Sequence, residues 1–486
     1  MPGSPTFEAD VAVIGAGGAG LFVAHSAAAL NARVALISAT SLAQTASYWA
    51  QGGLAAALAD DDSPERHLDD TERAGRGLVR SAAARALSEE APARVHELEE
   101  LGVHFDADPH GRIELALEGG HSRRRVAHAG GSATGRRVVR QLSAVVAADP
   151  AITVIENARA CALLRSEAAC AGVVCEDGRT ITARAVVICS GGGAALWART
   201  TNPPGSQGAG LLLARSVGAQ LADLEFVQFH PTAVIGVPGR EGFLVTEAIR
   251  GEGATLLDRD GERFVDELAP RDEVACAIQD RLDATGERAV ALDMRGVDPA
   301  RFPNVVSALA EAGLDVTKQT VPVAPAAHYV MGGIVTDMDG RATVPGLLAV
   351  GESACTGLHG ANRLASNSLT ECFVFGARAA RAALDQTPTS GAGTPEPAQA
   401  ATLEATPATR AALWERAGLR RDGGALEQLL EDEHPLARLV AAGALAREES
   451  RGAHRRIDWP EPDPALDHMH SILDAATDTP RMERWA

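Results

Sequence analysis

Histidine and arginine residues that lie beside glycine or proline form the most chemically suggestive set in this chain. His230 lies in a Gln-Phe-His-Pro-Thr run, His328 between Ala327 and Tyr329, and Arg271 directly after Pro270. Arg363 follows Gly360-Ala-Asn, and the planar fork of an arginine binds carboxylates through two hydrogen bonds. A lone histidine is more often a core residue, and Arg363 alone fits an ordinary salt bridge. Together, in an acidic chain, these residues favour a dicarboxylate pocket.

Three further residues extend this set of candidates. Thr246 and Glu247 open a Thr-Glu-Ala-Ile-Arg-Gly-Glu-Gly run, and Glu118 precedes two glycines and the basic run 123–125. Taken alone, the Glu118 segment is typical of a solvated loop. Its glycine-flanked carboxylate is therefore the weaker of these candidates when it is judged from the residues alone.

A dinucleotide fingerprint stands near the start of the chain. The apolar run 11–14 leads directly into Gly15-Ala-Gly17-Gly18-Ala-Gly20, and an alanine-rich helical segment follows. Gly15 permits a tight turn, Gly17 lets the backbone approach a pyrophosphate, and Gly20 lets the helix pack close to the strand. The N-terminus of that helix then holds the phosphates.

The residues after the fingerprint favour FAD over NAD. The second strand, expected at 33–37, is followed by Ser38 and not by the Asp or Glu that binds the ribose hydroxyl of a nicotinamide cofactor. Ser38 can still form a hydrogen bond and is a candidate cofactor contact. Glu352 follows the apolar run 344–351, at the carboxyl end of an expected parallel strand, where α/β folds bind ligands. There it can accept hydrogen bonds from ribityl hydroxyls. A surface turn is the alternative interpretation, but the fingerprint near the start of the chain favours a cofactor contact for Glu352.

These elements predict an α/β fold, with a Rossmann-like FAD-binding domain, an inserted α+β capping domain and a C-terminal helical domain. Residues 224–336 break the Ala/Gly-rich texture and carry most of the polar constellations. The stretch 386–410, rich in Pro, Thr, Ser, Gly and Ala, is typical of a linker. The predicted division is 1–223 and 337–385 for the FAD-binding domain, 224–336 for the cap, 386–410 for the linker and 411–486 for the helical domain.

Composition narrows the class of protein. The 486 residues carry a formal net charge of −19, which argues against a nucleic-acid or anionic-membrane partner. The N-terminus lacks the basic and apolar regions of a signal peptide. The seven cysteines have no metal-ligand spacing. We therefore expect a cytoplasmic protein with reduced cysteines and no metal.

The motifs, in this order, resemble the succinate dehydrogenase/fumarate reductase flavoprotein superfamily. They are GAGGAG (15–20), AQGG (50–53), QFHPT (228–232), TEAIRGEGA (246–254), APRD (269–272), HYVMGGI (328–334), PGLLAVGE (345–352), HGANRLASNSL (359–369) and ESRGAH (449–454). Within it the chain is similar to the L-aspartate oxidase family, whose Glu-Gly-Gly-His segment matches Glu118–His121. Respiratory members carry a flavin-linking histidine at the position of Ala46, so the resemblance implies non-covalent FAD.

The resemblance also implies a reaction and roles for the candidate residues. L-aspartate would be oxidised to iminosuccinate, oxygen or fumarate would reoxidise the flavin, and quinolinate synthase would use the product for NAD synthesis. His230, His328, Arg363 and Thr246 would hold the carboxylates. Arg271 matches the proton-shuttling arginine of fumarate reduction. Glu247 would position Arg271, and Glu118 would contact the amino group.

The resemblance places further cofactor contacts outside the fingerprint and Glu352. These are Ser47, Gln51, Gly52, Gly53, Gly191, Ser368 and Leu369. Two alternatives remain open from the sequence. One is a flavoprotein subunit of succinate dehydrogenase or fumarate reductase, which Ala46 disfavours. The other is a non-catalytic FAD-binding protein, which the intact His/Arg set disfavours.

Overall fold

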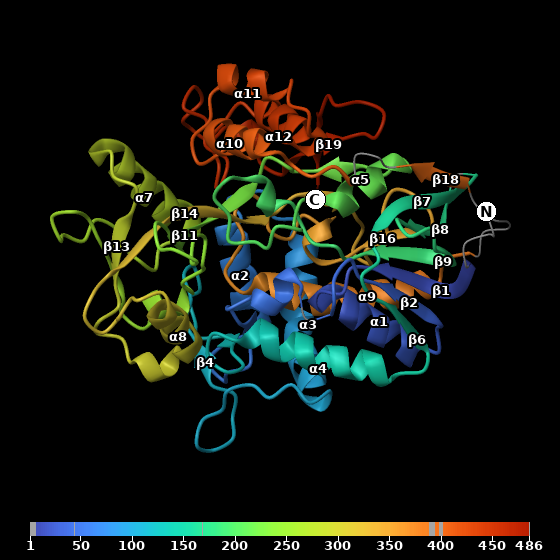
Figure 1. Ribbon diagram of the computed structural model, residues 1–486, viewed down its shortest axis with the longest axis horizontal. Coiled ribbons are helices and arrows are strands. Elements are labelled where there is room, and N and C mark those ends of the chain that lie inside the picture. Colours follow the sequence, from blue (N-terminus) through green and yellow to red (C-terminus); the bar gives the residue numbers. More distant parts are fainter. Residues whose placement is uncertain (1–5, 43, 168, 388–393, 398–401, 486) are drawn as a thin grey trace.

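An eight-stranded sheet organises the FAD-binding part of the protein (Figure 1). The computed structural model describes residues 6–42, 44–167, 169–387, 394–397 and 402–485. Strands follow the order β18-β7-β8-β9-β1-β2-β6, and β16 also pairs with β9. Their bounds are β1 Thr6–Ile14, β2 Val34–Ile37, β6 Ile152–Ile155, β7 Ala160–Ser166, β8 Ala169–Cys175, β9 Thr180–Ile188, β16 Leu347–Ala349 and β18 Thr394–Pro397.

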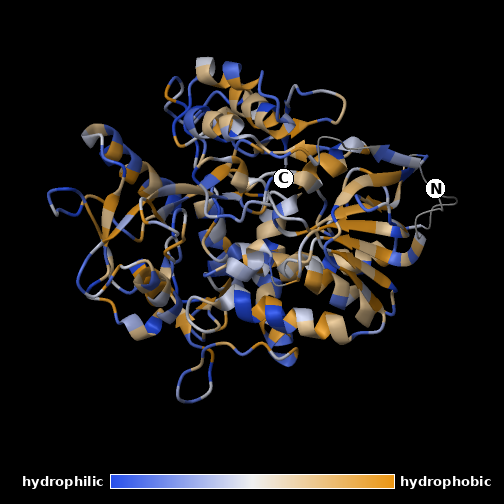
Figure 2. Ribbon diagram, viewed as in Figure 1, coloured by the Kyte–Doolittle hydropathy of each residue, from blue (hydrophilic) through white to orange (hydrophobic). Residues whose placement is uncertain are grey.

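The central strands pair in parallel, which brings their carboxyl ends to one edge. β1 pairs in parallel with β2 and β9, β2 with β6, and β9 with β16. β2 and the C-terminal halves of β1 and β9 are continuously apolar, as strands covered on both faces must be (Figure 2). The glycine turn after β1 and the Gly351-Glu352 turn after β16 therefore lie at the same edge.

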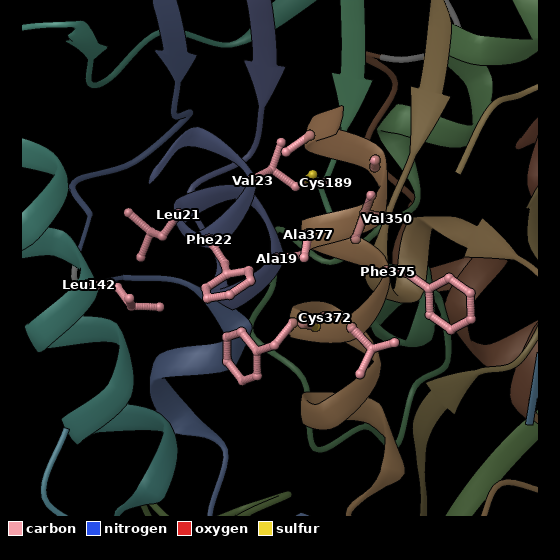
Figure 3. Close-up of a cluster of buried hydrophobic side chains, with 14 of the residues drawn as sticks. Ala19, Leu21, Phe22, Val23, Leu142, Cys189, Val350, Cys372, Phe375 and Ala377 are labelled. Atoms are coloured by element: carbon pink, nitrogen blue, oxygen red, sulfur yellow. The ribbon is translucent and has the colours of Figure 1, made fainter. Parts of the chain in front are cut away.

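Helices α1 (Gly18–Ala29), α4 (Thr134–Ala148) and α9 (Asn367–Leu384) cover one face of this sheet, and α3 (Ser81–Glu100) packs against α9. Figure 3 shows side chains of α1, α4 and α9 converging in one apolar cluster. In it the Phe22 ring meets Phe373 edge to face, with ring centroids 5.2 Å apart. This packing fixes the start of α1 beside the start of α9, so two loops that face the site share one rigid support.

The capping region has a sheet and an apolar core of its own, at the left of Figure 1. Its sheet has the order β11-β14-β13-β12, and the core draws on residues between Val234 and Ala324. The bounds are β11 Val227–Val234, α6 Ala248–Gly251, β12 Thr255–Leu257, α7 Arg271–Thr285, β13 Val290–Asp293, α8 Pro303–Glu311 and β14 Val321–Val330. A separate core explains why the composition of this segment differs from the Ala/Gly-rich composition of the FAD-binding domain.

The C-terminal region is helical as far as Ala446 and then returns to a sheet. β19 pairs antiparallel with β10, in the five-stranded sheet β17-β15-β10-β19-β20. The bounds are β10 Leu221–Ala222, β15 Gly333–Val335, β17 Ala354–Cys355, α10 Pro407–Arg416, α11 Gly423–Leu429, α12 Pro435–Ala446, β19 Met469–Leu473 and β20 Arg481–Arg484. Within the stretch predicted as a linker, β18 lies antiparallel to β7, and α10 begins at Pro407.

Shorter elements complete the layers. They are η1 Ala46–Trp49, β3 Leu54–Ala55, α2 Pro64–Ala74, β4 Leu115–Ala116, β5 Val126–Ala127, α5 Ala209–Ser216 and η4 Gly351–Ser353. Within the described ranges, no helix combines the length and apolarity that a membrane crossing demands. The α/β architecture with an inserted capping region confirms the predicted fold class.

Candidate functional site

The structure brings most of the predicted site residues to one cavity, between the strand ends of the FAD-binding domain and the cap. The substrate candidates on its wall are Glu118, His230, Thr246, Glu247, Arg271, His328 and Arg363. The cofactor candidates on its wall are Gly17, Ser47, Gln51, Gly52, Gly53, Gly191, Glu352, Ser368 and Leu369. Gly15, Gly18, Gly20 and Ser38 are outside this lining, and Ser38 lies buried at the end of β2.

The glycine turn fits a dinucleotide. Gly15 has φ of +106°, and a Cβ there would lie 2.4 Å from the Cys189 carbonyl oxygen. A Cβ on Gly20 would lie 1.8 Å from the Gly15 carbonyl oxygen, so α1 packs closely on the turn. Gly17 is the N-cap of α1 and offers no side-chain cap. Apart from the Gly18 N–H, which donates to Ser47, the helix terminus is thus left for phosphate oxygens. Gly191 adds open space with no protein atom within 4 Å of its Cβ position.

Two polar side chains complete this cradle. Ser47 Oγ accepts a hydrogen bond from the Gly18 N–H at 3.0 Å. Glu352 Oε1 accepts one from the Val330 N–H at 2.9 Å. Burial raises the pKa of Glu352 to about 7, although the Val330 N–H and the Arg363 charge act in the opposite direction. A buried carboxylate of this kind gains from hydroxyl donors, which the ribityl chain of FAD carries.

A buried glutamine behind the cavity wall holds two of the lining arginines together. Gln228 Oε1 accepts from Arg271 Nη1 at 3.1 Å and from Arg363 Nη2 at 3.0 Å. Arg271 begins α7 and donates through Nε to Glu247 at 2.6 Å, while Arg363 donates to Ser368 Oγ at 2.7 Å. Burial and the charge of Arg271 lower the pKa of Arg363 to about 10, which leaves it cationic at neutral pH.

The two histidines come from neighbouring strands of the cap. The rings of His230 on β11 and His328 on β14 lie edge to face, with centroids 5.1 Å apart. His230 Nδ1 accepts from the Thr232 N–H at 3.2 Å, so its proton is on Nε2. His328 Nδ1 lies 2.7 Å from Thr201 Oγ1. Burial and nearby arginines lower the pKa of both histidines well below the usual range, so both are neutral donors.

Known proteins match this arrangement along nearly the whole chain. The FAD binding domain family matches residues 10–369, and the fumarate reductase flavoprotein C-terminal family matches 411–485. An L-aspartate oxidase of Caulobacter vibrioides is 46% identical, over 94% of this chain and 95% of its own. One of Mesorhizobium japonicum is 44% identical, over 97% and 96%. The E. coli quinol fumarate reductase subunit FrdA superposes with a TM-score of 0.87 at 30% identity, over 98% and 96%.

The chain belongs to the L-aspartate oxidase family. Members are FAD-dependent oxidoreductases of the superfamily that includes the fumarate reductase flavoproteins, so FAD is the cofactor of this chain. This confirms the predicted family and cofactor, and the roles of individual residues stay predictions.

In this L-aspartate oxidase family member, Glu118 is one of three acidic side chains on the wall of the pocket, with Glu247 and Glu352. Its Oε2 accepts from Ser366 Oγ at 2.7 Å, and its Oε1 lies 3.5 Å from His128 Nε2. The neighbouring Gly119 N–H donates to Glu247 at 2.9 Å. Burial alone would raise the pKa of Glu118, but His128, the Arg271 charge and Ser366 together lower it to about 2. Glu118 is therefore anionic at neutral pH.

Sequence reasoning did not assign roles to Gln228 or His128. Gln228 lies two residues before His230 on β11, so both side chains point to the same side of the strand. This alternation along the strand is the sequence pattern that could have predicted a place for Gln228 beside His230. His128 lies ten residues beyond Glu118, and no local pattern predicts their contact. Its place depends on β5 returning beside β4.

Proposed function

We propose that the protein oxidises L-aspartate to iminosuccinate with bound FAD. The observation that carries this proposal is the composition of one cavity wall. Arg271 and Arg363 share the Gln228 oxygen, and the anionic Glu118 faces the same space. Two cations with neutral histidine donors suit two carboxylates, and a buried anion suits an ammonium or amine.

The charged and the neutral side chains of the pocket would have different roles in substrate binding. Arg363, His230, His328 and Thr246 would bind the carboxylates and hold Cα in one orientation. Arg271, fixed by Glu247 at 2.6 Å, would add a positioned positive charge beside one carboxylate. When bound, FAD supplies the acceptor for the hydride that leaves Cα.

Glu118 would bind the nitrogen of the substrate. Its position beside His128 and Ser366 holds it anionic, so it attracts the substrate ammonium into the pocket. The amine must be neutral before hydride leaves Cα, and its proton must therefore pass to a group or a water near this carboxylate.

The second candidate is a flavoprotein subunit of succinate dehydrogenase or fumarate reductase. Ala46 lies in the cavity wall at the position where respiratory members carry a flavin-linking histidine. Alanine offers no nucleophile, so we expect acid precipitation to leave the yellow flavin in the supernatant. Flavin that stays with the precipitated protein would contradict non-covalent binding.

Hydrogen peroxide release tests the main proposal. Purified holoenzyme in air should release peroxide with L-aspartate and not with succinate. Reduction of an artificial acceptor by succinate, without any turnover of L-aspartate, would overturn the proposal in favour of the respiratory subunit.

We place the reaction in the cytoplasm at the start of NAD synthesis through quinolinate. Oxygen or fumarate would accept the electrons, and quinolinate synthase would consume the unstable imine. The support is the family membership and the fumarate-reductase-like fold.

A further inference from the structure

A second cavity of about 580 Å³ lies against the first one. It is enclosed by the start of α4, by β4 and by the start of α8, which lie side by side in Figure 1. Three arginines of α4, Arg136, Arg137 and Arg140, line it. Thr246 belongs to the walls of both cavities. The second cavity therefore adjoins the site to which the proposed function assigns the substrate.

The acids in this cavity already have partners. Glu114 lies 3.5 Å from Arg301, and Glu252 also pairs with Arg301. The Asp106 carboxylate accepts hydrogen bonds from the N–H groups of Gly130 and Gly131, both at 2.7 Å. None of these acids is paired with the arginines of α4.

In the described part of the chain, the three α4 arginines have no carboxylate within ion-pair distance. Arg136 and Arg140 lie 5.9 and 5.8 Å from the centre of the Tyr48 ring. Arg137 bends back over Gly130, where a Cβ would lie 2.5 Å from its Nε. These cations gather at the N-terminus of α4, the positive end of the helix dipole. Such an arrangement is stabilised by an anion.

Buried polar atoms point to the same ligand. Ser132 is 5% exposed and His128 is 8% exposed, and both line this cavity. Ser132 Oγ and His128 Nδ1 lack a hydrogen-bond partner within the described residues, while His128 Nε2 faces Glu118 at 3.5 Å. Unpartnered polar groups this deeply buried are uncommon in folded proteins, so they indicate a missing polar ligand or water.

We propose that this cavity is an electropositive entrance that binds dicarboxylates and passes them to the flavin-side cavity. The inference rests on the proposed function, because that function supplies the dicarboxylate. A chain with a net charge of −19 repels an anionic substrate at long range. A local cluster of arginines without carboxylate partners makes the electrostatic potential positive at this cavity. The positive potential raises the rate constant for association of an anionic substrate.

Fumarate binding to the oxidised holoenzyme gives a direct test. Fumarate cannot react there, because oxidised flavin has no hydride to give, so stopped-flow flavin absorbance reports binding alone. We expect the triple variant Arg136→Gln, Arg137→Gln, Arg140→Gln to lower the association rate constant about tenfold at low salt. In about 0.5 M salt the two proteins should agree within about twofold, because the charges are then screened.

A matched variant controls for the change in net charge. Arg66→Gln, Arg288→Gln, Arg381→Gln removes the same charge from exposed positions outside both cavities. It should bind fumarate within about twofold of the wild-type rate at every salt concentration. An equal fall in both triple variants, or no fall in the α4 variant, would overturn the proposal.

Two further measurements separate the causes of failure. Flavin content and the thermal midpoint establish that the α4 variant is folded, and the single variant Arg140→Gln should show a smaller fall with the same salt dependence. If the wild-type protein neither oxidises L-aspartate nor binds fumarate, both the proposed function and the proposed entrance are excluded. If the wild type is active but the α4 variant binds fumarate with the same association rate constant, only the proposed entrance is excluded.

Discussion

Single residues determine the charge of the substrate pocket. Glu118 is anionic because its neighbours outweigh the cost of burial, and His230 and His328 are neutral because burial and arginines act together. Neutral histidines donate hydrogen bonds without adding repulsion to Arg271 and Arg363. The wall therefore carries Arg271 and Arg363, the acid Glu247 that pairs with Arg271 at 2.6 Å, and the anionic Glu118, whose charge complements an ammonium group.

Glu118→Gln should separate the amino acid from the dicarboxylate that lacks nitrogen. Removing one member of a buried charge pair costs about 2–5 kcal/mol, so we expect kcat/KM for L-aspartate to fall by about 30-fold or more. Fumarate reduction with an artificial donor should stay within about fivefold, since fumarate has no nitrogen to lose. If both activities fall in parallel, Glu118 only orders its loop.

Glu352 should make FAD affinity depend on pH. Its folded pKa of about 7 lies above the ordinary value of 4.5 because the side chain is buried. The ionised form accepts hydrogen bonds from hydroxyls more strongly than the protonated form. We therefore expect the dissociation constant of FAD from the apoprotein, measured by flavin fluorescence, to be about fivefold larger near pH 6 than near pH 8.

The stability of the apoprotein should change with pH in the opposite direction. A raised carboxyl pKa contributes stability that is complete below the unfolded pKa and is lost as pH rises through the folded one. For Glu352 that window runs from 4.5 to about 7. Glu352→Gln should abolish both trends, and a variant that keeps the wild-type pH dependence of FAD binding would assign the effect to another group.

The sequence indicated which residues are candidates for the site better than it indicated which residues contact one another. His230, Arg271, Arg363 and Glu118 stood out because their types and glycine or proline neighbours are local features. Gln228 did not, because its role is to accept from two arginines, one 43 and the other 135 residues away. A hydrogen bond between distant segments leaves no local pattern.

At the level of elements, the strand–glycine–helix units were predictable and the late strand partners were not. β1, α1 and β2 follow one another along the chain, so period and turn residues were enough. β18 pairs with β7, and β19 with β10, across more than 200 residues. The β18 segment is short and proline-rich and has the composition of a linker, so only tertiary pairing makes it a strand.

The start of α1 provides a test of how closely helix and strand pack. A Cβ on Gly20 would lie 1.8 Å from the Gly15 carbonyl oxygen, whereas on Gly18 it would meet only ordinary contacts, from 3.6 Å. We expect Gly20→Ala to destabilise the apoprotein by more than about 2 kcal/mol and to prevent FAD binding. Gly18→Ala should leave the unfolding free energy unchanged or slightly raised. Equal denaturant midpoints for the two variants would contradict this packing.

At the scale of the whole molecule, the residue after Arg271 connects three regions. The Asp272 carboxylate is fully buried and accepts from Arg76 Nε at 3.2 Å and from Arg76 Nη2 at 3.0 Å. Arg455 of the C-terminal region lies 3.5 Å away. The cap therefore meets both the FAD-binding domain and the C-terminal region at the N-terminus of α7, next to Arg271, which lines the flavin-side cavity.

Asp272→Asn should loosen the cap and weaken substrate binding without loss of FAD. Breaking a buried ion pair costs about 3–5 kcal/mol, and the partial exposure of Arg76 reduces that to about 2 kcal/mol. We expect faster proteolysis within the cap and a KM for L-aspartate about tenfold higher.

Arg420→Gln is the matched control, because it breaks exposed pairs from the C-terminal region to Asp280 and Asp283 on the same helix. Exposed pairs contribute less than about 1 kcal/mol, so this variant should resemble the wild type. Equal cleavage rates in the two variants would show that the position of the cap does not depend on the buried pair.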